Sequence, residues 1–106
     1  MTKYEILTKD ISQAIYEAKA IAKVTNEKGT CNCDFAIVHL PRWNHKKVFE
    51  AVERAGTTAL YFDDWKGFAI VNPVSGQGNR RTEQAETIYE VMQDLGYNVS
   101  FYCQTD

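Results

Sequence analysis

The sequence predicts an α+β fold in which helices pack against a four-stranded antiparallel sheet. Short runs rich in β-branched and aromatic residues alternate along the chain with longer segments whose apolar residues recur at helical spacing. After a first helix, the expected order is strand, helix, strand, strand, helix, strand. With 106 residues, the chain is expected to form one domain, residues 1–106, around a single core.

The first expected helix covers residues 10–25. Asp10 and Gln13 have the spacing of a capping box, and the apolar residues that follow recur at helical spacing. Gly29 follows as a stop. Residues 1–9 contain too few apolar side chains to decide between a short edge strand and an unstructured lead-in.

A central strand and a second helix come next. Residues 33–40 form an almost wholly apolar run, which is typical of a strand buried on both sides. Asn44 is placed to cap a helix that ends at Gly56. Residues 57–63 are rich in β-forming side chains and predict the second strand.

The third strand is expected in residues 66–73, joined to the second by a turn that contains Asp63 and Asp64. A glycine-containing loop, residues 74–79, leads to a third helix that ends at Gly96. The last strand, Tyr97 to Gln104, alternates apolar and polar side chains and is therefore half-buried.

Two right-handed crossovers in this order give a ferredoxin-like βαββαβ sandwich over residues 33–104, with strand order 4-1-3-2 and both helices on one face. The helix of residues 10–25 is an addition to this core. It must bury its apolar stripe, because a single amphipathic helix of this length is unstable in water. The sequence leaves open whether it lies across the free sheet face, packs at an edge or forms a homodimer with a second copy.

Charge and composition exclude some classes of function. A net charge of −2 argues against a strongly basic nucleic-acid binder. No apolar run approaches the roughly 20 residues that span a bilayer, and the first residues do not resemble a signal peptide, so we expect a cytoplasmic protein without a membrane partner. The odd number of cysteines, Cys31, Cys33 and Cys103, favours reduced thiols.

Residues 66–73 resemble the octapeptide of RNA recognition motif (RRM) domains, Lys/Arg-Gly-aromatic-Gly/Ala-aromatic-Val-x-aromatic. Ile70 and Pro73 stand where that pattern has aromatic rings, and Ala36 stands where the first strand of the family has another. The resemblance implies base stacking on the open sheet face by Phe68, with Lys66 as a phosphate contact.

The sequence assigns a mixed aliphatic surface to that face, which favours a protein partner over nucleobases. The residues placed on it are Ala36, Val38, Ala59, Tyr61, Phe68, Ile70 and Tyr102. The candidate partner-binding residues are accordingly Lys66, Phe68, Ile70, Tyr61 and Tyr102.

Basic residues suggest an anion site at one end of the sheet. We expect the first and third strands to run parallel, so that their C-terminal ends, and the starts of the second and third helices, share this end. The candidate anion-binding residues are Arg42, His45, Lys46, Lys47, Arg80 and Arg81. Gly76 and Gly78 resemble only part of a phosphate loop. The alternative is a solvated basic rim.

The opposite end is expected to gather Asp34, Asp63, Asp64, Trp65 and the three thiols. The hairpin resembles the Tyr-x-Asp-Asp hairpin of polymerase palm domains, where carboxylates hold magnesium. Adjacent aspartates at a turn are more often turn residues, and three thiols are fewer than the four ligands of structural zinc. We therefore expect no metal site, no cofactor and no catalytic residues.

Three functions follow from these features. The first is a non-enzymatic module that binds a protein, since small inhibitors and adaptors of viral or mobile-element origin are similar in size and in lacking catalytic motifs. The second is binding of RNA or single-stranded nucleic acid by an RRM-like sheet. The third is a small metal-dependent enzyme that uses Asp34, Asp63 and Asp64.

Overall fold

The computed structural model describes the backbone of residues 1–29 and 31–105 and the side chains of residues 1–29 and 35–102. The described elements are α1 (Lys3–Val24), β1 (Cys31–His39), α2 (His45–Ala55), β2 (Ala59–Phe62), β3 (Gly67–Ile70), α3 (Asn79–Asp94) and β4 (Asn98–Thr105). The chain is α+β, as the sequence predicts. No helix of this described part is both long and apolar enough to cross a membrane.

The strands form one sheet in the order β2-β3-β1-β4, which confirms the predicted order read from its other edge. β1 pairs antiparallel with β3, where Val38 is opposite Phe68, and antiparallel with β4, where Val38 is opposite Val99. The expectation that the first and third strands run parallel is therefore wrong. A crossover makes β2 parallel to β1, and the hairpin then reverses β3. The C-terminal end of β1 thus lies beside the start of β3.

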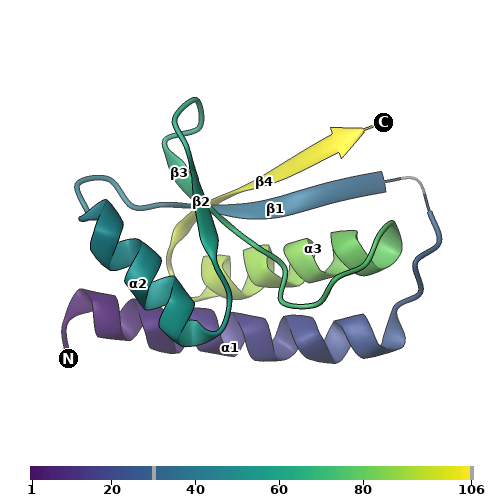
Figure 1. The fold of residues 1–106 in the computed structure, drawn as a ribbon, viewed down its shortest axis with the longest axis horizontal. Coiled ribbons are helices and arrows are strands. Elements are labelled where there is room, and N and C mark those ends of the chain that lie inside the picture. The colour runs from purple at the N-terminus through teal and green to yellow at the C-terminus, as the bar shows by residue number, and fades with distance from the viewer. Residues whose placement is uncertain (30, 106) are drawn as a thin grey trace.

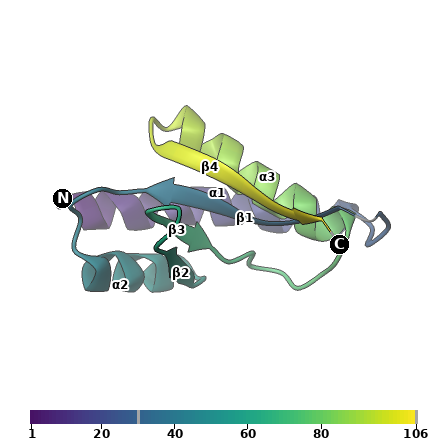
Figure 2. The ribbon, with the colours of Figure 1, turned by 90° about the horizontal axis from the view of Figure 1, so that it is seen from above.

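All three helices lie on one side of the sheet (Figure 1). Seen from above, α1 lies behind β1, with α2 on one side and α3 on the other (Figure 2). The buried residues of α1, such as Ile11 and Ala14, belong to the same core as Val38 and Phe68 of the sheet. The first helix therefore covers neither the free sheet face nor an edge. Its apolar stripe is buried within its own chain, which removes the reason for expecting a homodimer through this helix.

Helix α1 begins at Lys3, seven residues before the expected start at Asp10. Its capping box is formed by Thr2 and Glu5: the Thr2 hydroxyl accepts from the Glu5 backbone N–H at 3.2 Å, and the Thr2 N–H donates to Glu5 Oε1 at 3.0 Å. Leu7 then extends the buried stripe. Residues 1–9, left open by the sequence, are mostly helix.

Hydrogen bonds fix α1 against the elements on either side of it. The Thr8 hydroxyl donates to the carbonyl of Ala51 in α2 at 2.9 Å. The Tyr97 hydroxyl, just before β4, donates to Asp10 Oδ2 at 2.6 Å. Burial and this hydrogen bond raise the pKa of Tyr97 well above its usual range, so the hydroxyl stays a donor at neutral pH. Asp10 thus anchors the middle of α1 and does not cap its start.

Local signals placed the remaining elements correctly. The Asn44 side chain caps α2 by accepting from the Lys47 N–H at 3.0 Å, and Gly56 ends the helix with a φ of 107°. Gly96, with a φ of 96°, follows α3 as predicted. β2 and β3 are shorter than the expected ranges 57–63 and 66–73, because turn and loop residues occupy the ends of both ranges.

The core position of α1 gives a stability prediction. Ile11 is 0% exposed, whereas Ile6 on the same helix is 43% exposed. We expect Ile11→Ala to lower the free energy of unfolding by about 2–5 kcal/mol, because it leaves a cavity between helices and sheet. The matched change Ile6→Ala is expected to cost less than about 0.5 kcal/mol. Urea denaturation followed by circular dichroism measures both, and equal losses would contradict this packing.

Candidate interaction surface

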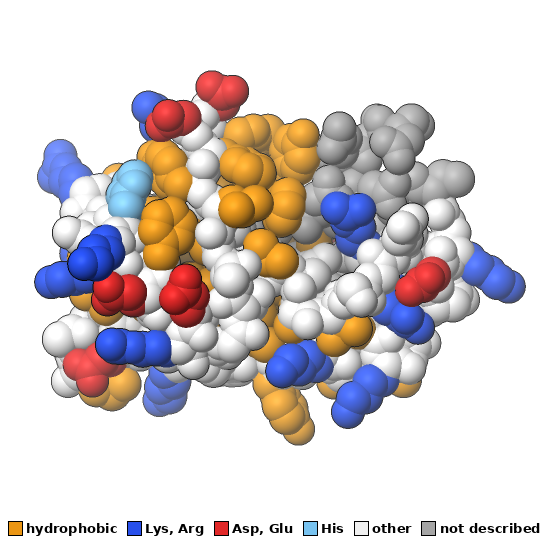
Figure 3. All heavy atoms as spheres, in the orientation of Figure 1, with side chains coloured by type: hydrophobic (Ala, Val, Ile, Leu, Met, Phe, Trp, Pro, Cys, Tyr) orange, Lys and Arg blue, Asp and Glu red, His pale blue; other side chains and the backbone are white. Residues whose placement is uncertain are grey.

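The sheet face opposite the helices is not covered by any other described element, and a group of rings lies on it. This aromatic cluster consists of Phe35 (β1), Phe62 (β2), Trp65 (the β2–β3 turn) and Tyr102 (β4). Phe35 is opposite Tyr102 in the β1–β4 ladder, whereas the neighbouring pair Ala36 and Phe101 faces the helices. In Figure 3, hydrophobic side chains gather over the β2–β3 hairpin, below acidic side chains at its tip.

The rings of the aromatic cluster contact one another edge to face. Phe35 and Phe62 have ring centroids 5.6 Å apart at an interplanar angle of 84°. Tyr102 lies 6.1 Å from Phe62 and 5.4 Å from Trp65, at angles of 73° and 88°. Such pairs contribute about 0.5–1.5 kcal/mol each beyond their buried area. The cluster spans the sheet from β2 to β4 and still exposes 42% of Trp65.

Small residues below the rings let the cluster pack closely. Ile37 and Ala69 point to this face and are fully buried. Gly67 leaves room for Ile37, since a Cβ there would collide with Ile37 Cγ2 and lie 3.0 Å from His39 Nδ1. The His39 ring bridges the face, with Nδ1 3.1 Å from the Lys66 carbonyl and Nε2 2.7 Å from the Ser100 hydroxyl. Since a carbonyl only accepts, Nδ1 carries a proton.

The hairpin tip combines exposed acidic groups with an aromatic wall. Backbone bonds hold the turn: Trp65 N–H donates to the Phe62 carbonyl and Lys66 N–H to the Asp63 carbonyl, both at 3.2 Å. A pocket of about 340 Å³ lies here, lined by Tyr61, Phe62, Asp63, Asp64, Trp65 and Tyr102. The carboxylates of Asp63 and Asp64 are exposed, and within the described part of the chain neither one forms a hydrogen bond or an ion pair.

The structure removes three of the predicted partner-binding residues from the open face. Phe68 and Ile70 are each only 1% exposed and face the helices, and Tyr61 packs on Phe68 with ring centroids 5.0 Å apart. The ring position of the RRM-like octapeptide is therefore in the core and cannot stack a base. Of the remaining two, Tyr102 lies in the aromatic cluster and Lys66 is exposed at the hairpin.

The basic residues do not form the single site that was expected. Because β1 and β3 are antiparallel, the basic residues after β1 lie at the end of the sheet near the hairpin; they are Arg42, His45, Lys46 and Lys47. The chain leaves β3 at the opposite end of the sheet and continues from there to Arg80 and Arg81. His45 also packs on Tyr61, with ring centroids 4.3 Å apart. The shared anion site is thus wrong, for the same reason as the parallel strands.

The start of α3 is occupied by the chain itself. Arg80 pairs with Glu27 at 3.1 Å and donates from Nε to the Thr25 carbonyl at 3.1 Å. The Asn79 N–H donates to the Lys28 carbonyl at 2.8 Å. A Cβ on Gly78 would lie 2.7–2.9 Å from the carbonyl oxygens of residues 27–29. Carbonyl oxygens repel an anion, so this helix start is not a phosphate site.

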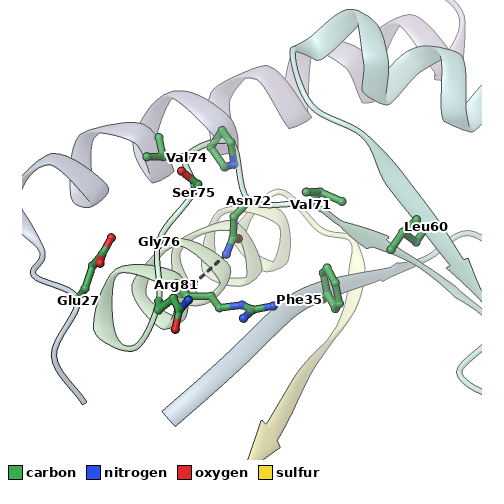
Figure 4. A pocket seen from close by; sticks show the side chains of 11 residues that line it. Glu27, Phe35, Leu60, Val71, Asn72, Val74, Ser75, Gly76 and Arg81 are labelled. Atoms are coloured by element: carbon green, nitrogen blue, oxygen red, sulfur yellow. Dashed lines mark hydrogen bonds between the residues drawn. The ribbon is translucent and has the colours of Figure 1, made fainter. Parts of the chain in front are cut away.

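A groove of about 860 Å³ extends from the aromatic cluster along residues 71–77. Figure 4 shows Phe35 and Leu60 at one side of it, with the Arg81 side chain extending toward Phe35. The Asn72 amide donates to the Arg81 carbonyl at 3.0 Å, while Asn72 Oδ1 is buried with no hydrogen-bond partner among the described residues. The groove continues the open face away from the hairpin tip.

The three-aspartate metal site does not assemble. Phe62, at the start of the hairpin turn, is opposite Gly67 on β3, and Gly67 lies beside His39 on β1. Asp34 comes five residues before His39 on β1. At about 3.3 Å per residue, its backbone is therefore about 16 Å along the sheet from the hairpin. Among the residues whose side chains are described, no three His, Cys, Asp or Glu side chains are grouped to hold a metal. Cys33 and Cys103 are partners in the ladder, and the side chains of Asp34 and the three cysteines lie outside the described residues.

Comparison with protein-family models, with curated proteins and with solved structures finds no match for this chain. The surface therefore has to be interpreted from its own geometry.

Sequence reasoning missed most of the open face, namely Phe35, Leu60, Phe62 and, as part of a cluster, Trp65. The available signal was alternation: Phe35 and Phe62 have the opposite parity to Ala36 and Tyr61 within their strands. Parity alone does not decide which set faces the helices when both sets are apolar.

The closed start of α3 gives a second stability prediction. Gly78 and Gly56 both have positive φ, 57° and 107°, but an added Cβ meets backbone only at Gly78. We expect Gly56→Ala to cost about 1–2 kcal/mol from backbone strain. Gly78→Ala is expected to cost about 1–3 kcal/mol more, because the carbonyls of residues 27–29 must move and because its ψ of −127° lies outside the left-handed region that L residues can adopt. Thermal unfolding compares the two variants, and equal losses would mean that residues 27–29 do not close the helix start.

Proposed function

We propose that this protein is a non-enzymatic interaction module that binds a partner protein through the open face of its sheet. The aromatic cluster carries this proposal, since it is a half-buried apolar surface that the described helices leave uncovered. Leu60, 48% exposed on β2, enlarges the apolar area beside it. Exposed apolar patches rimmed by polar residues mark interaction sites in soluble domains.

Charge favours a protein over a nucleic acid. Binding to a phosphate backbone needs several Lys or Arg side chains along the surface, because neutralising phosphates supplies most of the affinity. The tip of this face instead carries Asp63 and Asp64, with Lys66 as the adjacent cation, and the whole chain has a net charge of −2. An aromatic face with an acidic border matches a partner with apolar and basic side chains.

Binding of single-stranded nucleic acid is the second candidate, because rings on the uncovered face of such a sheet are the usual means of base stacking. Against it, Asp63 and Asp64 border this face, and carboxylates repel a phosphate backbone. A cytoplasmic location and a viral or mobile-element origin stay predictions from the sequence.

Site-specific crosslinking tests the protein-binding face. Placing the photoreactive amino acid p-benzoylphenylalanine at Trp65 puts it on the open face, and placing it at Tyr16, 76% exposed on α1, puts it on the helical side. In extract of the cells that make the protein, we expect position 65 to form one dominant protein adduct. Position 16 is expected not to form this adduct.

Competition makes this result specific. Excess wild-type protein should abolish the adduct, and so should Ile6→Lys, which changes an exposed residue of α1. Excess Leu60→Lys should fail to compete, because a charge on β2 disrupts an apolar contact with the partner. An adduct that survives wild-type competition, or that forms only from position 16, would contradict the proposal. An adduct between two copies of the chain would mean that the partner is a second copy of this protein.

Titration of labelled single-stranded RNA at low and high salt separates the second candidate from the first. We expect no salt-dependent binding at micromolar protein, since the acidic tip of the face opposes a phosphate backbone. Fluorescence anisotropy measures this directly. Binding that weakens steeply with salt and is lost in Phe35→Ala would instead favour the nucleic-acid function.

A further inference from the structure

The pocket at the hairpin tip has walls of two kinds. Its aromatic lining residues are Tyr61, Phe62, Trp65 and Tyr102, and its acidic lining residues are Asp63 and Asp64. Trp65 and Tyr102 meet almost at a right angle, 88°, so one ring presents its face beside the edge of the other. The pocket therefore offers aromatic surface and negative charge to the same ligand.

The turn itself does not use the two carboxylates. Aspartates at turns commonly accept hydrogen bonds from nearby backbone N–H groups. Here the N–H groups of Trp65 and Lys66 donate to backbone carbonyls, those of Phe62 and Asp63. Lys66, the cation nearest in sequence, forms no ion pair with either carboxylate. Both acids remain available for a group from outside the described chain.

We propose that this pocket receives an arginine side chain of the partner protein. This inference rests on the proposed function and names the chemistry of the residue that anchors the partner. A guanidinium group packs flat on an aromatic face and at the same time donates hydrogen bonds to carboxylates in a planar fork. The ring of Trp65 and the acids Asp63 and Asp64 provide both kinds of contact within one pocket.

Other ligands fit the pocket less well. An anion would meet two carboxylates, and an apolar side chain would desolvate them without a partner. A metal ion would find two carboxylates among aromatic side chains, which is short of the oxygen ligands that magnesium or calcium needs. Lysine offers a compact charge but no plane to stack on Trp65.

NMR titration with a blocked amino acid tests the inference without the unknown partner. The indole N–H of Trp65 reports on the pocket, and that of Trp43, which packs on Tyr4 at the start of α1, serves as an internal control. We expect N-acetylargininamide to shift the Trp65 signal saturably at millimolar concentration, while the Trp43 signal stays in place. N-acetylcitrullinamide, the neutral isostere, is expected to leave both signals unchanged.

Charge-removing variants complete the test. Asp63→Asn combined with Asp64→Asn should weaken arginine binding by roughly ten-fold or more, since it removes charge-assisted hydrogen bonds. Asp94→Asn, an exposed acid at the end of α3, should bind as wild type does. The inference is overturned if citrulline shifts Trp65 equally, if the double variant binds arginine unchanged, or if no shift appears.

The outcomes distinguish this inference from the proposed function. If arginine binding fails while the crosslink at position 65 still competes as expected, the partner docks on the face without an arginine anchor. If arginine binding succeeds while the crosslink is absent or not competed, the pocket recognises guanidinium but the proposed protein-binding function is wrong.

Discussion

The structure depends on one constraint: β1 and β3 are apolar on both sides, while helices cover only one side of the sheet. Ala36, Val38, Phe68 and Ile70 face the helices, and Ile37 and Ala69 face the other way. Apolar side chains left in water would cost stability at roughly 25 cal/mol per Å². The rings of Phe35, Phe62, Trp65 and Tyr102 therefore close over the second face. They cover it only in part, and this incomplete cover is the basis of the proposed docking surface.

The sheet face opposite the helices is open because of the position of α1. Ala14 and Ala18 are fully buried, so the helix lies close between α2 and α3, and its hydrogen bonds from Thr8 and to Tyr97 fix it there. Its apolar stripe is used up in this contact. A helix lying across the sheet would have buried the aromatic cluster instead and left a core of two helices and a sheet. This additional helix thus thickens the covered side of the sheet and leaves the other face open.

The two ends of the open face differ in charge. The hairpin end has two carboxylates beside Trp65 that pair with no described residue, and the opposite end leads into the groove along residues 71–77. The basic residues of the chain are not gathered on this face. One group of them lies at the start of α2, and Arg80 is bound by contacts with residues 25–29. The acidic tip disfavours a phosphate backbone, whereas the proposed partner, a protein segment with one arginine and neighbouring apolar residues, would complement the described residues of this face.

The sequence by itself determined the α+β class, the strand order, the Asn44 cap, the hairpin turn and the helix end at Gly96, because each depends on local backbone chemistry or on hydrophobic periodicity. Only the tertiary structure decided the rest. Period-two alternation cannot tell which face of β3 is inside when both are apolar, so Phe68 was placed on the wrong side. The start of α1 follows from the Thr2–Glu5 capping box and the contacts that Leu7 makes in the core. The pairing of Arg80 with residues 25–29, and the meeting of Phe35, Phe62 and Tyr102, join segments far apart in the chain, and such contacts exist only once strand direction and register are set.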